Sequence, residues 1–176
     1  MLWAYNLNYM DWLNQPDMPY EIGARWIDDF INNLPSNSVG QDPYPIALRA
    51  INWIKFITKY WDDIPTEKRT EWCNSLYSQY QLLIKKLEYH LLANHLLEDV
   101  YSLFIGAIFF RNEKIYKLST KLLKRELNEQ ILKDGAHYEQ SVMYHIILLE
   151  RLLDCYNFSF NNICFVGQDR INDFLY

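Results

Sequence analysis

The chain has 176 residues, half of them hydrophobic, and a net charge of −5 at neutral pH, which suits one domain with a substantial core. The small numbers of glycines and prolines, 5 and 6, argue against a turn-rich all-β protein. The negative net charge gives no sign of a basic surface for nucleic acid. No apolar run is long enough to cross a membrane, and residues 1–6 lack the pattern of a signal peptide. Cys73, Cys155 and Cys164 show no metal-ligand spacing, so no metal or disulfide framework is predicted.

The first 14 residues form an aromatic segment whose secondary structure the pattern leaves open. Four aromatic residues alternate with asparagines there, and Pro16 and Pro19 end the segment. Aromatic residues make up 16% of the whole chain. This content is compatible with a core of large side chains and also with a carbohydrate cleft in which sugar faces stack on rings.

Hydrophobic periodicity predicts that the rest of the chain is mainly helical. The predicted helices cover residues 20–34, 45–60, 65–87, 90–110, 113–132 and 142–156. Residues 36–44 are predicted to form a loop, Asp134-Gly135 a turn and residues 136–140 an extended segment. Residues 163–166 fit a short strand or a helix start, and residues 170–176 fit a helix. The predicted fold is all-α, a single domain over residues 1–176 built from helical hairpins as in an α/α barrel or helical array.

The predicted helix 45–60 has two distinct faces. One is an apolar stripe, and the other carries Arg49, Asn52, Trp53 and Phe56 at helical spacing. An Arg beside Asn and Trp is suited to an anionic sugar, because a guanidinium can donate two parallel hydrogen bonds to a carboxylate or sulfate. The alternative is an Arg that stacks on Trp with its head in solvent.

The predicted helix 90–110 carries amide, imidazole, carboxylate and phenol groups opposite a broad apolar arc. Asn94, His95 and Glu98 are the core of this polar face. It is typical either of a functional cleft or of buried polar groups that hydrogen bond to one another and to the backbone. In the last helix, Ser141 is the predicted N-cap, and Tyr144 and His145 lie in the first turn. The residues alone favour the interpretation of Tyr144 as an aromatic side chain packed under the turn at Gly135.

Four stretches in this order resemble the helical domain of the heparinase II/III-like family of polysaccharide lyases. They are residues 3–13 (WAYNLNYMDWL), 42–53 around Asp-Pro-Tyr-Pro and Arg-Ala-Ile-Asn-Trp, 93–98 (ANHLLE) and 134–145 (DGAHYEQSVMYH). The resemblance implies a partial (α/α) toroid without the family's C-terminal β-sandwich. It also implies β-elimination on a uronic-acid polysaccharide, and the family is often periplasmic or secreted.

The resemblance assigns roles to particular residues. Asn94 and His95 correspond to the pair that neutralises the uronate carboxylate, and Glu98 to an acidic position that orients His95 or the substrate. Tyr144 corresponds to the general acid and possible base, with His145 beside it to orient the phenol. The expected substrate contacts are Arg49, Asn52, Trp53, Asn6, Tyr9 and Glu139.

The resemblance implies no cofactor and no metal in this chain, and an anionic polysaccharide as the partner. The family's further catalytic His has no counterpart here, so the chain is expected to be a fragment with an incomplete active site. Two other functions stay open. One is a carbohydrate-binding or assembly domain without catalysis. The other is an α/α-barrel glycoside hydrolase using Glu98 and Glu139 as its carboxylate pair. The identity of the uronate also stays open between heparan-type, alginate and exopolysaccharide substrates.

Overall fold

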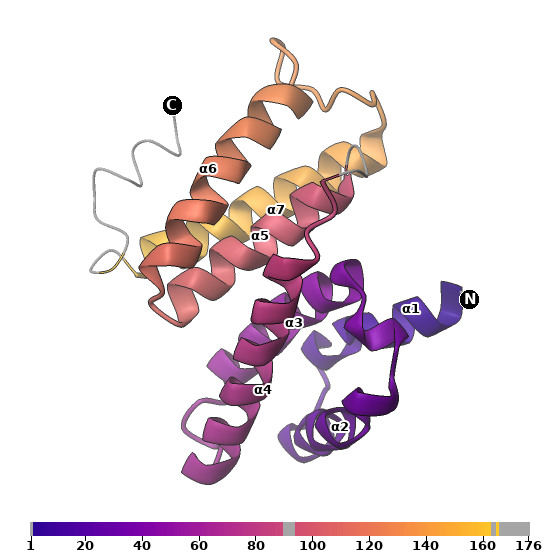
Figure 1. The fold of residues 1–176 in the computed structure, drawn as a ribbon, viewed down its shortest axis with the longest axis vertical. Coiled ribbons are helices and arrows are strands. Elements are labelled where there is room, and N and C mark those ends of the chain that lie inside the picture. Colours follow the sequence, from indigo (N-terminus) through magenta and orange to yellow (C-terminus); the bar gives the residue numbers. More distant parts are fainter. Residues whose placement is uncertain (1, 90–93, 163–164, 166–176) are drawn as a thin grey trace. The chain divides into compact units, whose positions relative to one another are not determined.

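The computed structural model describes residues 2–89, 94–162 and 165. Within these ranges the chain is all-α, as predicted, and its β-structure is one isolated antiparallel bridge between Ile131 and His137. The helices are α1 (Leu2–Tyr9), α2 (Tyr20–Asn33), α3 (Pro43–Lys59), α4 (Thr66–Lys85), α5 (Asn94–Phe109), α6 (Glu113–Gln130) and α7 (Val142–Phe160) (Figure 1). Short 3-10 helices η1 (Asp11–Asn14), η2 (Leu34–Ser36) and η3 (Val39–Gln41) connect the first three.

Most helix boundaries agree with the sequence prediction, and the differences have local causes. The aromatic N-terminal segment forms α1 and η1. Helix α3 begins at Pro43 rather than Pro45, because a proline is tolerated in the first turn, where backbone N–H groups have no helical partner. Ser141 is the N-cap of α7 as predicted, but its side chain makes no capping hydrogen bond. Of the predicted elements, residues 90–93, 163–164 and 166–176 lie outside the described ranges.

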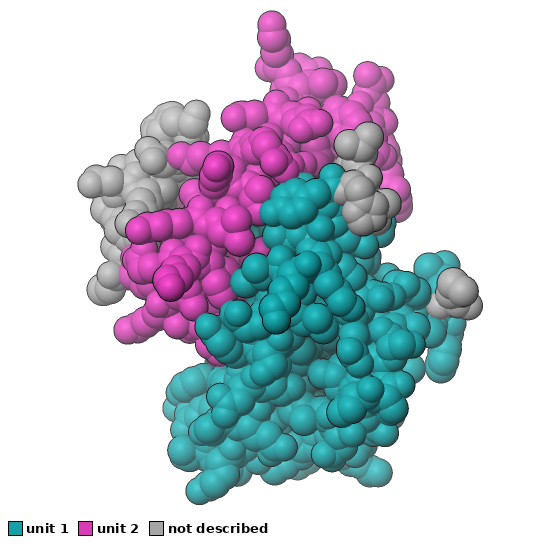
Figure 2. Space-filling view, in the orientation of Figure 1, with its two compact units in different colours: residues 1–102 teal, residues 103–176 magenta. Residues whose placement is uncertain are grey.

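Contacts divide the chain into two compact units, residues 1–102 and 103–176, shown in different colours in Figure 2. The sequence predicted one helical domain over residues 1–176. Unit 1 contains α1 to α4 and the first half of α5, and unit 2 contains the second half of α5 with α6 and α7. Each unit is a set of packed helices with its own buried apolar residues.

Helix α3 is the centre of unit 1, in contact with α1, η1, η3 and α4. Its predicted apolar stripe is fully buried, and Arg49, Trp53 and Phe56 on the other face are buried as well. Helix α2 also packs closely within this unit. A Cβ atom at Gly23 would lie 2.4 Å from the Phe56 ring, so only glycine allows this approach of α2 to α3. The face that the sequence predicted as a recognition surface is therefore part of the core.

In unit 2, α6 is in contact with α5. Phe104 of α5 contacts Tyr116 of α6, with ring centroids 5.4 Å apart. Helix α6 is amphipathic as predicted: Leu122 and Leu123 are buried, and Asn112 caps its first turn by accepting from two backbone N–H groups. The turn before α7 is confirmed too, with Gly135 at a φ of 86°.

Candidate functional site

His95 is an exposed side chain in the first turn of α5, held by contacts from two other segments of unit 1. Its exposed side-chain fraction is 47%, and its Nδ1 lies 3.0 Å from Glu88 Oε2. Tyr44, at the start of α3, places its ring centroid 4.6 Å from that of His95. An ionised carboxylate only accepts hydrogen bonds, so Glu88 fixes the proton on Nδ1 and leaves Nε2 for another partner.

Tyr9 extends this group, because its ring meets Tyr44 edge-on with a centroid distance of 5.7 Å. Tyr9, Tyr44, Glu88 and His95 are called the His95 cluster below. They come from α1, α3, the segment after α4, and α5. The fold therefore brings together four side chains that are as many as 86 positions apart in the sequence (95 − 9 = 86). The cluster combines aromatic rings with an oriented imidazole, which is a combination that suits a polar ring-shaped ligand.

A hydrogen-bonded tyrosine–aspartate pair lies near the cluster. Tyr5 donates a hydrogen bond to Asp42 Oδ2 at 2.6 Å. This bond, with burial and the negative charges of Asp42 and Glu88, raises the pKa of Tyr5, and burial raises the pKa of Tyr9. Both phenols consequently stay protonated at neutral pH and act as hydrogen-bond donors.

Asp99 supports the cluster from the interior. It is fully buried, its Oδ2 accepts from the Glu88 backbone N–H at 3.4 Å, and its Oδ1 has no hydrogen-bond partner among the described residues. Burial, together with the charges of Glu88 and Glu98, raises the pKa of Asp99 to about 8. Asp99 is thus mainly protonated at neutral pH, although the sequence analysis gave it no role.

The other predicted residues of α5 have different surroundings. Asn94 is the first residue of the helix, and its side chain lies outside the described structure. Glu98 is 3% exposed and therefore interior. The carboxylate that bonds the His95 ring is Glu88, whereas the sequence analysis considered Glu98 for that role. Glu88 precedes α5 and is not part of that helix, so the polar face of the helix gave no signal for it.

In unit 2, Tyr144 and His145 occupy the first turn of α7. Tyr144 is half-buried, with its ring centroid 6.1 Å from that of His137, and His145 is exposed beside a shallow pocket. Glu139 is exposed and accepts a hydrogen bond from the Tyr138 hydroxyl at 3.4 Å. The phenol of Tyr144 therefore adjoins an imidazole, but that imidazole is His137.

His137 is a buried residue to which the sequence analysis assigned no role, although it lies within one of the quoted motifs. Its Nδ1 accepts from the Glu139 backbone N–H at 3.4 Å, so Nε2 carries the proton and donates to Gln130 Oε1 at 3.3 Å. Gln130 in turn donates to Glu126. This series of bonds fixes the segment that leads into α7 and hence the position of Tyr144.

Arg49 has a different role from the predicted one. It is fully buried and donates hydrogen bonds to Gln79 Oε1, to the Asn8 carbonyl and to the Gly40 carbonyl. Its guanidinium also lies 4.3 Å from the centroid of the Phe30 ring. Arg49 is buried because α1, η3 and α4 all surround this face of α3. Arg49 therefore joins segments of unit 1 and does not face solvent.

The remaining predicted substrate residues divide into buried and accessible groups. Trp53 is fully buried, with its indole N–H 3.1 Å from Met10 Sδ, so it does not offer a free ring face. Asn52 is half-buried and donates to the Tyr9 carbonyl at 2.9 Å. Asn6 is exposed and Tyr9 half-buried. Of this set, Asn6 and Tyr9 remain accessible for a ligand.

Within the described ranges, no set of three or more His, Cys, Asp or Glu side chains is arranged to hold a metal ion. Over the same residues, no helix combines the length and hydrophobicity that a membrane span requires.

Within the described ranges, the packed helices define an all-α protein. The chain matches the family described as heparinase II/III N-terminus over residues 46–163. This match covers more than half of the chain, which therefore belongs to that polysaccharide-lyase-related family. The matched region contains Asn94, His95 and Tyr144, whereas Tyr9 and Tyr44 precede it. Comparison with curated proteins and with solved structures gave no match.

Proposed function

We propose that this chain is a fragment of a polysaccharide lyase that acts on a uronic-acid polysaccharide by β-elimination, and that it carries the elimination residues Asn94, His95 and Tyr144. The observation that carries the proposal is His95 itself: an exposed imidazole held by Glu88 and in tilted ring contact with Tyr44, at a position that the family match covers. The proposal goes beyond the family assignment, which by itself specifies neither a substrate nor a mechanism.

In the proposed reaction, the C5 proton of the uronate leaves, a C4=C5 double bond forms and the C4–O4 bond breaks. O4 takes up a proton, and no water is consumed. The C5 proton is weakly acidic while the adjacent carboxylate keeps its full charge, so donors must take up charge on that carboxylate. We assign this role to Asn94 and to the imidazolium form of His95, which donates from Nε2 while Glu88 accepts from Nδ1.

The proton transfer is assigned to Tyr144, which acts as general acid toward O4 and also removes the C5 proton. His137 is the imidazole next to this phenol, and it is fixed by Gln130. Asn6 and Tyr9 are proposed contacts for the saccharide, since both are accessible. Glu98, which is buried, is assigned a supporting role inside α5.

The test is the ultraviolet absorbance of the unsaturated uronate during incubation with a panel of uronic-acid polysaccharides. The wild-type chain should produce a rising signal that Tyr144→Phe removes. Tyr138→Phe is the matched control, because Tyr138 is an exposed tyrosine of the same segment. A signal that survives in Tyr144→Phe would overturn the assignment of the proton transfer.

Two other results would replace the proposal with one of the alternatives. Saccharide binding without any unsaturated product would make the chain a binding or assembly domain. New reducing ends with saturated products would indicate a glycoside hydrolase, for which Glu98 and Glu139 are the predicted carboxylates. The burial of Glu98 and the exposure of Glu139 disfavour this last option.

A further inference from the structure

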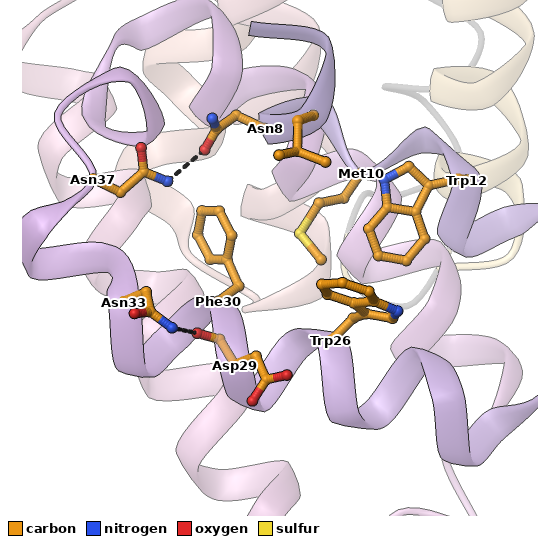
Figure 3. A pocket seen from close by; sticks show the side chains of 9 residues that line it. Asn8, Met10, Trp12, Trp26, Asp29, Phe30, Asn33 and Asn37 are labelled. Atoms are coloured by element: carbon orange, nitrogen blue, oxygen red, sulfur yellow. Dashed lines mark hydrogen bonds between the residues drawn. The ribbon is translucent and has the colours of Figure 1, made fainter. Parts of the chain in front are cut away.

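A pocket in unit 1 has no role in the proposed elimination. It lies between α2 and the segment formed by α1 and η1, and Figure 3 shows its lining. Trp12, Trp26, Phe30 and Met10 supply apolar surfaces, and amide and carboxylate side chains lie at its edge. An apolar pocket with a few polar groups at defined positions is the usual form of a small-molecule site.

The aromatic walls are held in place by the core. Trp12 and Trp26 meet edge to face, with centroids 5.5 Å apart and an interplanar angle of 74°. Phe30 is fixed by the Arg49 guanidinium, 4.3 Å from its centroid, and by Trp53, whose ring centroid is 5.6 Å away. Trp26 nevertheless remains 49% exposed, so part of its indole surface is available to a ligand.

The polar edge is also ordered before any ligand binds. Asn37 donates to Asn8 Oδ1 at 2.7 Å and accepts from the Gly40 N–H at 3.0 Å, and Figure 3 shows this amide pair at the pocket. Asn33 donates to the Asp29 backbone carbonyl at 2.7 Å. The edge therefore presents amides and the Asp29 carboxylate, which hydrogen bond readily to hydroxyl groups.

Charge and size restrict what the pocket accepts. Among its lining residues there is one carboxylate, Asp29, and no Lys or Arg, which disfavours a uronate or sulfate. Arg25 pairs with Asp29 from outside the lining, at 3.8 Å, and both side chains are exposed. The pocket volume is about 160 Å³, well below the range of about 300–1,000 Å³ typical of drug-sized ligands, so one ring fits and a longer segment does not.

We propose that this pocket binds one neutral pyranose ring of a saccharide. A pyranose has an apolar C–H face and a polar hydroxyl edge, and the pocket places indole and phenyl surfaces beside amide and carboxylate groups in the same way. The proposed ligand differs in charge from the uronate of the elimination reaction. This proposal does not depend on catalysis, and it stands even if the chain cleaves nothing.

The test is tryptophan fluorescence of the wild-type chain titrated with neutral glucose, galactose and mannose tetrasaccharides, and with a uronate tetrasaccharide. At least one neutral tetrasaccharide should change the emission and bind, and Trp26→Ala should weaken that binding about tenfold or more. Trp61→Ala is the matched control, because Trp61 is similarly exposed at 42% in the same unit but lies outside the pocket. It should leave the affinity unchanged.

Asn33→Ala provides a second variant that leaves the aromatic walls in place, and it should also lower the affinity for the neutral sugar. Circular dichroism of each variant verifies that it folds, and calorimetric titration measures binding without relying on Trp26 emission. The proposal is overturned if no neutral tetrasaccharide binds, if Trp61→Ala weakens binding as much as Trp26→Ala does, or if the uronate tetrasaccharide displaces the neutral one. Loss of elimination in Tyr144→Phe with unchanged neutral-sugar binding would separate this site from the proposed reaction.

Discussion

Arg49 and Gln79 are joined by two hydrogen bonds to a single oxygen, with Gln79 Oε1 2.9 Å from Arg49 Nε and 2.7 Å from Nη2. The bonds connect α3 to α4, and further bonds from the same guanidinium reach the Asn8 and Gly40 carbonyls. Burial lowers the pKa of Arg49 to about 9, so it is still charged at neutral pH. One buried cation therefore links four segments of unit 1.

Removal of this cation should destabilise the chain. Arg49→Leu leaves the Gln79, Asn8 and Gly40 oxygens without their donor in the interior, so we expect a loss of roughly 3 kcal/mol or more in the free energy of unfolding. Urea denaturation followed by circular dichroism measures it. Arg25→Leu removes an exposed arginine of the same unit and should change stability by no more than about 0.5 kcal/mol. Normal stability of Arg49→Leu, with lost saccharide binding, would favour the surface-recognition interpretation instead.

Glu88 should control the function of His95 without being essential for folding. Glu88→Gln removes the carboxylate that holds Nδ1–H of His95, and loss of such a charge-assisted bond is worth about 1.5–3 kcal/mol. We expect the elimination rate to fall roughly tenfold to a hundredfold, with a larger effect on kcat than on KM. Glu67→Gln, an exposed carboxylate on α4, is the control. An unchanged rate in Glu88→Gln would show that Glu88 does not position His95.

Asp99 should make stability depend on pH in a defined direction. Its pKa in the folded chain is about 8, above the ordinary value of 3.8, so the unfolded state releases this proton first. The contribution of Asp99 to stability is therefore present at low pH and is lost progressively as pH rises from about 4 to about 8. Asp99→Asn cannot ionise and should become increasingly more stable than wild type over that interval. Urea midpoints measured from pH 5 to 9 test this, and parallel curves for the two proteins would contradict it.

Gly40 is expected to accept no side chain. A Cβ atom there would lie 2.6 Å from Asn37 Nδ2 and 2.7 Å from Asn8 Oδ1, so it would separate the amide pair at the edge of the pocket. Gly40→Ala should cost about 1–3 kcal/mol of stability and weaken neutral-sugar binding. Ser38→Ala, at an exposed neighbouring position, should do neither. Thermal unfolding of both variants measures the stability change, and calorimetric titration measures the change in sugar affinity.

The sequence predicted the helices well because their apolar periodicity and proline boundaries are local signals. The stripe on α3 and the buried face of α6 were both recognisable for this reason. The function predicted for the other face of α3 was not confirmed. The sequence pattern around Arg49 is the same whether its hydrogen bonds go to a sugar or to an oxygen of the same chain. Gln79, which accepts two of these hydrogen bonds, is 30 residues away in the sequence and gives no local signal.

The candidate site was predictable in part for the same physical reason. His95 could be singled out because it lies on a polar helical face inside a recognisable motif. Glu88 and Tyr44 could not be placed beside it, since their contacts with His95 depend on how the segment after α4 and the start of α3 pack against α5. The pocket around Trp26 was likewise not predictable, because its walls come from η1 and α2, which are separate elements in the sequence.

The most direct test of the proposed elimination is the mass of the products from a uronate oligosaccharide of defined length incubated with the chain. Elimination adds no water, so we predict two fragments whose masses sum to the mass of the substrate, and we predict that Tyr144→Phe forms neither. Fragments whose masses exceed that sum by one water would contradict the account and indicate hydrolysis. An oligosaccharide returned intact would also contradict it, and would leave the chain as an incomplete or binding-only domain of its family.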